Sequence, residues 1–327
     1  MADVAWGLLL HLSMNMWTDR KQIDEGEFLT PSERVPFHDN LPEMFDEDVY
    51  AQATADLAEA GGTMVVLDLG DGVVYDSHPE IAAGGAWSKQ RLADELARLR
   101  DLGLEPIPKL NFSSSHDAWL REWSRQLSTP AYYTVCRDLI AEVTEAFDGP
   151  RFFHVGMDEE QASHQLTYDF VTVRQGELWW HDLNVYLDAV RAAGPRPWMW
   201  SDMAWGDPSY YGKVAADVVQ SNWYYDINFD VAARDEPAPV TYDQAALTYL
   251  DLAGKGFDQI PTGASWRYES NMADTVRFCA ENLDPAQVLG FLQTIWKPTQ
   301  RPYAGRIADS IQQLSDAKAV WEDKGSR

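Results

Sequence analysis

Cysteine is scarce in this 327-residue chain, which has two, Cys136 and Cys279. Both fall in segments with a helical pattern, and neither belongs to the paired Cys and His spacing of a structural metal site. A disulfide between them is compatible with the sequence, but we expect two buried thiols without a partner. The seven histidines do not cluster, so the sequence predicts no metal site, and no motif indicates a cofactor.

Long apolar runs are also absent. No stretch of 18 or more apolar residues occurs, which excludes a membrane-spanning helix of the usual length. The first residues, MADVAW, lack the basic region and the cleavage site of a signal peptide. We expect no signal peptide in the chain as given, which leaves open both a cytoplasmic protein and an exported one whose signal has been removed.

Basic residues are few. Lys and Arg together number 26 against 52 for Asp and Glu, a formal net charge of −26. Such a field repels nucleic-acid phosphates and anionic lipid surfaces, so we expect neither nucleic acid nor a membrane as a partner. For most surface acids, solubility is a sufficient explanation.

Short β-rich apolar runs alternate with longer helical patterns along the chain. We expect strands over residues 4–12, 63–68, 104–110, 151–156, 197–201, 217–222, 258–262 and 288–294. Helices are expected over 47–60, 88–102, 129–147, 177–193, 208–215, 241–254, 271–283 and 304–322. Eight strand–helix units with parallel connections favour an α/β fold, a single (β/α)8 TIM-barrel domain over residues 1–327. No GxGxxG or Walker-type loop follows a strand, which weighs against a nucleotide-binding sheet.

Enzymes with this barrel carry their chemistry at the carboxyl ends of the strands. Here those positions hold acids, a histidine and many aromatic rings, and two long loops, 13–45 and 69–87, follow the first two strands. In strand order, the residues at these ends are Asn15, Trp17, Asp68, Asp71, Lys109, Asn111, His116, Asp158, Glu159, Trp200, Asp202, Trp223, Tyr224, Tyr225, Asp226, Trp266, Arg267, Trp296 and Lys297.

This inventory is typical of a carbohydrate site. Carboxylates do acid and base work at a glycosidic bond, and indole faces cover the apolar face of a sugar ring. Taken singly, Asp158 and Glu159 could cap a helix, Asp68 could form a turn, and Trp200 could pack the barrel. Their meeting on one rim favours a site with a carbohydrate ligand. Neighbouring side chains of a strand point to opposite faces, so the chain must bend for Asp158 and Glu159 to share a ligand.

The fourth expected strand, Phe153–Glu159 (FHVGMDE), resembles the His-x-Gly-x-Asp-Glu motif of glycoside hydrolase family 20, the β-N-acetylhexosaminidases. The order of further segments around the barrel agrees with that family. Pro108–His116 resembles its Pro-Glu-Ile-Asp-x-Pro-Gly-His segment, Trp198–Asp202 its Trp-x-Asp segment, Tyr224–Asp226 its Tyr-x-Asp segment, and Gly290–Trp296 the end of its last strand. Asp68–Asp71 falls where the family has an acidic loop.

The resemblance implies a retaining, substrate-assisted mechanism, in which the 2-acetamido oxygen of the sugar attacks the anomeric carbon. Glu159 would be the general acid and then the base, Asp158 would hold the acetamido N–H, and Tyr224 would donate to the acetamido oxygen. His116 would tune Glu159, whose pKa we expect its neighbouring carboxylate and burial to raise. The remaining expected substrate contacts are Asp68, Asn111, Trp200, Asp202, Trp223, Asp226, Trp266 and Trp296.

Two residues with which the family grips its terminal sugar are missing. The family usually has an Arg at the end of the first strand, where this chain has His11–Trp17 (HLSMNMW). It also has a Glu two residues after the last-strand Trp, whereas here Trp296 is followed by Lys297 and a proline. Recognition of the sugar hydroxyls is therefore expected to differ. Lys297, Arg267 or Lys109 would suit an anionic substituent such as sulfate.

Two other functions fit the same residues. One is a glycosidase of different specificity that uses two protein carboxylates, Glu159 with Asp202 or Asp226. The other is a barrel that binds carbohydrate without cleaving it, in which Glu159 is dispensable. The identity of the sugar, its linkage and the oligomeric state do not follow from the sequence.

Overall fold

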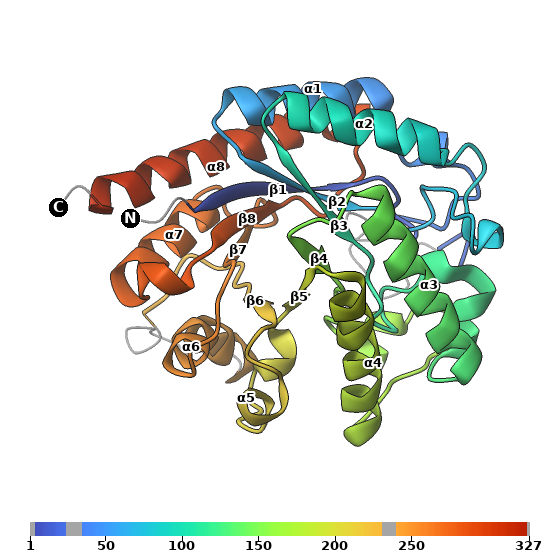
Figure 1. The fold of residues 1–327 in the computed structure, drawn as a ribbon. Coiled ribbons are helices and arrows are strands. Elements are labelled where there is room, and N and C mark those ends of the chain that lie inside the picture. The colour runs from blue at the N-terminus through green and yellow to red at the C-terminus, as the bar shows by residue number, and fades with distance from the viewer. Residues whose placement is uncertain (1–3, 24–34, 231–239, 326–327) are drawn as a thin grey trace.

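A computed structural model describes residues 4–23, 35–230 and 240–325. Its strands are β1 (Ala5–His11), β2 (Met64–Asp68), β3 (Glu105–Lys109), β4 (Phe152–His154), β5 (Arg196–Trp200), β6 (Val219–Ser221), β7 (Thr262–Ala264) and β8 (Gly290–Thr294). Its α-helices are α1 (Glu47–Glu59), α2 (Lys89–Asp101), α3 (Pro130–Ala146), α4 (Glu177–Ala193), α5 (Tyr210–Lys213), α6 (Val240–Gly254), α7 (Asn271–Asn282) and α8 (Ala304–Gly325). Strand and helix alternate along the described chain, and the helices surround the strands (Figure 1).

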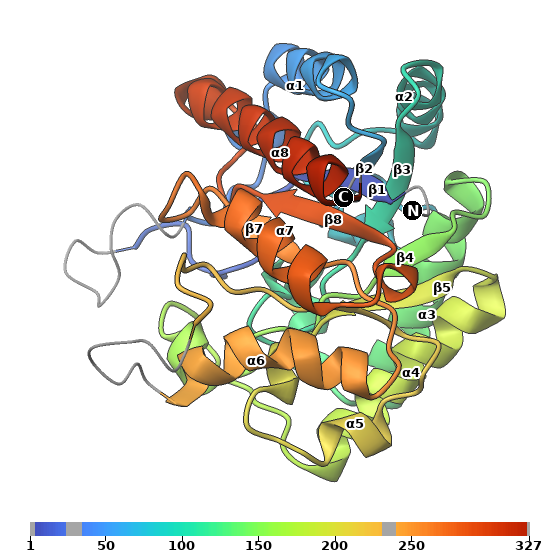
Figure 2. The same ribbon diagram turned by 90° about the vertical axis from the view of Figure 1, so that its left-hand side faces the viewer.

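The strands form one parallel sheet in the order β6-β5-β4-β3-β2-β1-β8-β7. The barrel closes beside β6, where the Gln220 N–H donates to Asp258 O at 3.0 Å and the Thr262 N–H donates to Asn222 O at 2.9 Å. The predicted (β/α)8 barrel is therefore confirmed. In the view of Figure 2, α7 and α8 lie side by side over β8. Because all strands are parallel, their carboxyl ends meet on one face of the barrel.

Side chains on the two faces of each strand pack in different hydrophobic cores, one under the helices and one inside the barrel. Leu8 and Leu10 of β1 pack under the helices, whereas Leu9 points into the barrel interior. The interior is filled by apolar side chains from the other strands, namely Met64, Val66, Ile107, Phe152, Trp198, Trp200, Val219, Ile260 and Leu292. The barrel is thus a packed core, and the rim at the carboxyl ends remains for a ligand.

The seventh strand and the fifth helix differ from the prediction. Strand β7 begins at Thr262 rather than at 258, because Pro261 has no N–H to donate to the ladder. The residue before it, Ile260, still pairs with β6 through Gln220 O at 2.9 Å. Helix α5 is a single turn, because Val214 already has the extended backbone that leads to β6 (ψ 137°).

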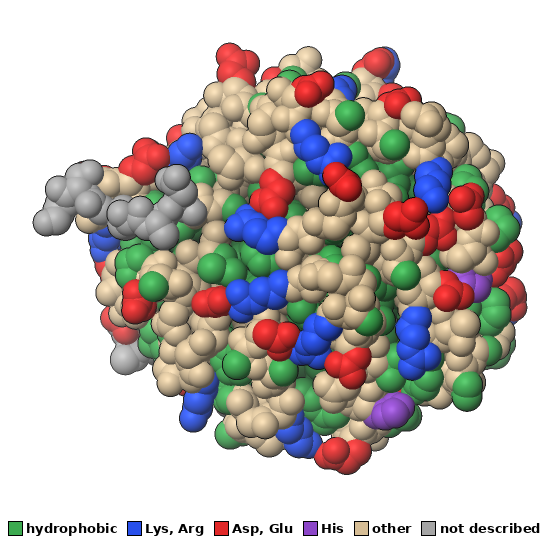
Figure 3. All heavy atoms as spheres, viewed as in Figure 1, with side chains coloured by type: hydrophobic (Ala, Val, Ile, Leu, Met, Phe, Trp, Pro, Cys, Tyr) green, Lys and Arg blue, Asp and Glu red, His purple; other side chains and the backbone are tan. Residues whose placement is uncertain are grey.

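Charged side chains of both signs are mixed over the face seen in Figure 3, and neither sign forms a continuous patch there. Ion pairs join neighbouring strands, as between Arg151 and Glu105 (2.6 Å). The two cysteines are buried and unpaired in α3 and α7, as expected. Among the described residues, no helix is both long and apolar enough to cross a membrane.

Candidate active site

The turn after β4 brings Asp158 and Glu159 to the same side. Gly156, Met157 and Glu159 have φ of 71°, 74° and 53°, values that side chains other than glycine rarely adopt. This is the bend that the sequence requires if both acids are to face one ligand. Left-handed backbone at non-glycine residues costs free energy and is concentrated at functional sites.

Asn111, which follows β3, holds this turn together. Its Oδ1 accepts from the N–H groups of Met157 and Ser113, both at 3.1 Å. Its Nδ2 donates to Asp158 Oδ1 at 2.8 Å. A Cβ added at Gly156 would lie 2.0 Å from Asn111 Oδ1, which explains the glycine. Asn111 was predicted as a substrate contact, but its amide is occupied within the protein, where it orients Asp158.

Two imidazoles face Glu159. His116 is buried, with its Nδ1 3.7 Å from Asp158 Oδ1 and its Nε2 3.5 Å from Glu159 Oε2. His164 Nδ1 lies 3.2 Å from the same Glu159 oxygen. His116 was expected beside the acid pair, whereas His164 was not identified from the sequence, because no motif marks the loop after β4.

These imidazoles reverse the expected ionisation of Glu159. Burial raises the pKa of the Glu159 carboxyl, but hydrogen bonding and charge from His116 and His164 outweigh burial and hold the pKa below its ordinary value. In turn, burial lowers the pKa of His116, but Asp158 and Glu159 more than compensate and raise it. The raised pKa predicted for Glu159 is therefore wrong, because the prediction relied on burial and the neighbouring acid, gave the His116 contact too little weight and did not include His164.

Asp202, which follows β5, is a buried carboxyl that favours its protonated form. Burial, followed by the charge of Asp158, raises the pKa of Asp202 well above its ordinary value. Its Oδ2 accepts from the Glu159 N–H at 2.8 Å, and its buried Oδ1 has no hydrogen-bond partner in the described structure. Asp202 thus holds the turn at Glu159, whereas Asn111 holds it at Met157 and Asp158.

Aromatic rings line the rim beside the acids. Trp296 lies 5.9 Å from Trp200 and 6.2 Å from Trp17, measured between ring centroids. Trp17 also approaches His116, at 6.5 Å. Trp200 is fully buried, and Trp17 and Trp296 are partly exposed, so these two rings can present faces to a sugar. Trp296 has a φ of 54°, a second place where the rim uses left-handed backbone.

Of the two tyrosines after β6, Tyr225 faces the site and Tyr224 does not. Tyr225 stacks on Trp223 at 4.9 Å, and its hydroxyl accepts from Trp296 Nε1 at 3.0 Å. Burial first, with smaller contributions from the charges of Asp158 and Glu159, raises the pKa of Tyr225. The Tyr224 hydroxyl donates to Asn228 O at 2.9 Å, and its ring belongs to the core under the helices. The alternation that places Trp223 inside the barrel also places Tyr225 there, whereas Tyr224, the predicted donor, packs under the helices.

Beneath the rim, charged residues form a closed cluster. Asp68, at the end of β2, accepts from Lys109 Nζ at 2.6 Å and lies 3.1 Å from His11 Nδ1. Burial favours a raised pKa for Asp68, but Lys109 and His11 lower that pKa to about 2. Asp68 and Lys109 were predicted to contact a ligand. Both are instead buried and paired with each other, because adjacent strands place them side by side in register.

The remaining predicted contacts lie at the edge of the site. The Asp226 carboxylate accepts from the Ile227 N–H at 2.7 Å. The Lys297 ammonium lies 5.5 Å from the centre of the Trp266 ring, so these two are neighbours. Neither Asp226 nor Trp266 has a described contact with Asp158 or Glu159.

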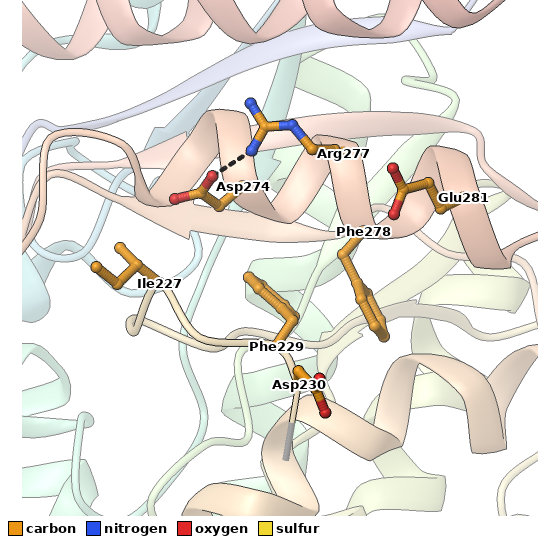
Figure 4. A pocket seen from close by; sticks show the side chains of 7 residues that line it. All are labelled: Ile227, Phe229, Asp230, Asp274, Arg277, Phe278 and Glu281. Carbon is orange, nitrogen blue, oxygen red and sulfur yellow. Dashed lines mark hydrogen bonds and ion pairs between the residues drawn. The ribbon is translucent and has the colours of Figure 1, made fainter. Parts of the chain in front are cut away.

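Among the described residues, the trio His116, Asp158 and Glu159 is the one group of three whose donor atoms, all within 4.8 Å of one another, are close enough for a metal ion. Asp158 already accepts from Asn111, and we interpret the trio as an acid–base cluster. A separate open pocket of about 410 Å³ lies against α7 (Figure 4). Its rings Phe229 and Phe278 stack on each other and its Arg277 pairs with Asp274. None of its described lining residues is a histidine, and we place the chemistry at the turn after β4.

Neither a family model nor a curated protein matches this sequence. Solved structures, however, match it over nearly its whole length, and the class they define is an α/β barrel with the glycoside hydrolase family 20 fold. The exo-β-N-acetylglucosaminidase of Vibrio harveyi, in complex with N-acetylglucosamine, is 16% identical with a TM-score of 0.58, over 98% of this chain and 58% of that one. The β-N-acetylhexosaminidase of Streptomyces coelicolor A3(2) is 13% identical with a TM-score of 0.62, over 98% and 70%. Dispersin B is 15% identical with a TM-score of 0.57, over 84% and 94%.

The fold of this chain is therefore family 20-like. The chain spans only 58% of the length of the Vibrio harveyi protein.

Proposed function

We propose that the protein is a retaining glycoside hydrolase that cleaves glycosides of 2-acetamido sugars by substrate assistance. The observation that carries the proposal is the turn after β4, which sets Asp158 and Glu159 side by side next to a buried imidazole at the mouth of the barrel. The family 20-like fold supports it, since that fold occurs in a solved complex with N-acetylglucosamine.

In the first step the acetamido oxygen of the sugar attacks the anomeric carbon, while Glu159, in the fraction of enzyme in which this carboxyl is protonated, gives its proton to the departing oxygen. Asp158 accepts the acetamido N–H and stabilises the positive charge that grows there. Asn111 keeps one Asp158 oxygen occupied, which leaves the other for the substrate. In the second step the Glu159 carboxylate takes a proton from water, and that water opens the oxazolinium ring.

The rim supplies the rest of the subsite. Tyr225 is the residue we assign to donate to the acetamido oxygen, because its hydroxyl lies beside Trp296 on the side of the acid pair. Trp17, Trp223 and Trp296 are partly exposed and would cover the apolar faces of the sugar.

A two-carboxylate mechanism is the second candidate, since Asp202 Oδ2 accepts from the Glu159 N–H. Its weakness is ionisation. The raised pKa of Asp202 favours the protonated form of this carboxyl, and a protonated carboxyl is a poor nucleophile.

Asp158→Asn separates the two mechanisms. Under substrate assistance we expect kcat on acetamido glycosides to fall by about 10²–10³-fold, because charge stabilisation in the transition state is lost. Any hydrolysis of glycosides that lack the acetamido group should change much less. Asp188→Asn, at an exposed position on α4, is the matched control. Equal losses on both kinds of substrate would contradict the role given to Asp158.

A further inference from the structure

His164 comes from a segment that the proposed chemistry does not use. It lies on a short 3-10 helix, Ala162–Gln165, between β4 and α4. Its side chain is 35% exposed, that of Glu159 is 29% exposed, and their nearest atoms are 3.2 Å apart. Glu159 therefore meets a buried imidazole on one side, from His116, and a solvent-facing imidazole on the other.

The position of His164 is built into the fold. The neighbouring residue, Gln165, is buried, and its Nε2 donates to Ser114 Oγ at 3.1 Å and to Thr172 O at 2.8 Å. Its Oε1 accepts from the Thr172 N–H at 2.8 Å. Ser114 belongs to the segment that carries His116, so the two imidazoles are fixed relative to each other through Gln165.

We infer that His164 is a positioning residue for Glu159, an inference that rests on the proposed function. Together with His116 it holds the Glu159 Oε2 atom, so that Oε1 is the oxygen presented to the glycosidic bond. Its contact also favours the ionised carboxyl in the enzyme without substrate. The enzyme is thereby set to work at a lower pH than one in which Glu159 has no second imidazole.

The groups around Glu159 give the sign of the effect. His116 and His164 stabilise the negative charge of Glu159. The nearest acids are Asp158, which His116 also contacts, and Asp202, which accepts from the Glu159 N–H. The charges of Asp158 and Glu159 contribute to the raised pKa of Tyr225. The charge of Lys109 opposes the rise in the pKa of His116. Replacing His164 by a neutral residue removes one of the two stabilising contacts, so the pKa of Glu159 rises.

The first test is the pH profile of kcat/KM for His164→Gln. Since kcat/KM reports ionisations of the free enzyme, the basic limb, where the general acid is lost, should move to higher pH by about one pH unit. His164→Lys places a positive charge at the same position, and its basic limb should return toward that of the wild type. His181→Gln, on the outer face of α4, is the matched control and should leave the profile unchanged. A profile of His164→Gln that superimposes on the wild type overturns the inference while leaving the proposed function intact.

A second measurement does not depend on turnover. With the glutamate side-chain carboxyls labelled with ¹³C, the Glu159 resonance is assigned as the one lost in Glu159→Gln, and its titration is followed by NMR. We expect the pKa of Glu159 to be higher in His164→Gln than in the wild type. An unchanged titration overturns the inference. If the wild type hydrolyses no glycoside, the proposed function fails, and this titration alone decides whether His164 acts on Glu159.

Discussion

The glycine of the turn after β4 offers a sharp test of how this site is assembled. In Gly156→Ala the new Cβ would lie 2.0 Å from Asn111 Oδ1 and 2.8 Å from Asn111 Cα. The second contact is with backbone, so a side-chain rotation of Asn111 does not relieve it. Asn111 must move, and with it the hydrogen bonds that hold the turn and Asp158.

The magnitude follows from two contributions. A non-glycine residue in the left-handed region costs about 1–2 kcal/mol, and each hydrogen bond of Asn111 that is lost costs about 1 kcal/mol. Asn111 makes three such bonds, to Ser113, Met157 and Asp158. We therefore expect Gly156→Ala to lower the free energy of unfolding by about 4 kcal/mol. Activity should fall further than stability accounts for, because Asp158 loses its orientation.

Gly149 provides the matched control at the other end of β4. It too has a left-handed φ, 65°, but a Cβ there would meet nothing within 4 Å. Gly149→Ala should cost only the conformational part, about 1–2 kcal/mol, and leave kcat unchanged. Urea unfolding and steady-state kinetics on both variants give the comparison. Equal stability losses, or a fully active Gly156→Ala, would refute the role assigned to Asn111.

Three further outcomes are expected. Lys109→Met removes the ammonium that pairs with the buried Asp68 carboxylate and leaves it only the His11 contact. This should cost about 3–5 kcal/mol in urea unfolding, whereas the double variant Asp68→Asn with Lys109→Met should recover most of that loss. The pKa of Asp68 is about 2 in the folded protein against an ordinary 3.8. The ionised carboxylate therefore stabilises the folded state by roughly 2 kcal/mol above about pH 4, and this contribution is lost as the pH falls through 2. Acid unfolding should therefore show a steeper loss in the wild type than in the double variant, and parallel curves would contradict it. Tyr225→Phe should lower kcat on acetamido substrates about 10-fold or more. Tyr224→Phe should instead cost about 1 kcal/mol of stability and leave kcat unchanged. The reverse pattern would show that Tyr224 is the residue in the site.

The sequence predicted the barrel because its regularity is local. Strand periodicity and helix caps such as Ser88, which accepts from the Arg91 N–H at the start of α2, lie within a few residues of each other. Tertiary context decided the end of α5, which depends on where the chain must enter β6. The start of β7 at Thr262 was within reach of the sequence, because Pro261 has no N–H to donate.

Within the site, the residues next to one another in sequence were easier to predict than their surroundings. Asp158 and Glu159 stand in a recognisable motif, but His164 reaches Glu159 only through the packing of Gln165, which no local pattern reveals. The pairing of Asp68 with Lys109 depends on the register of two strands. Tyr225 was within reach, because strand alternation from Trp223 indicates it.

The central claim is that Glu159 and the acetamido group of the substrate together cleave a glycosidic bond. The most direct measurement is hydrolysis of chromogenic β-N-acetylglucosaminide and β-N-acetylgalactosaminide beside β-glucoside and β-galactoside, by the wild type and by Glu159→Gln. We expect cleavage that is confined to the acetamido pair and lost in Glu159→Gln. Cleavage of the plain glycosides at a comparable rate, or full activity in Glu159→Gln, would contradict it.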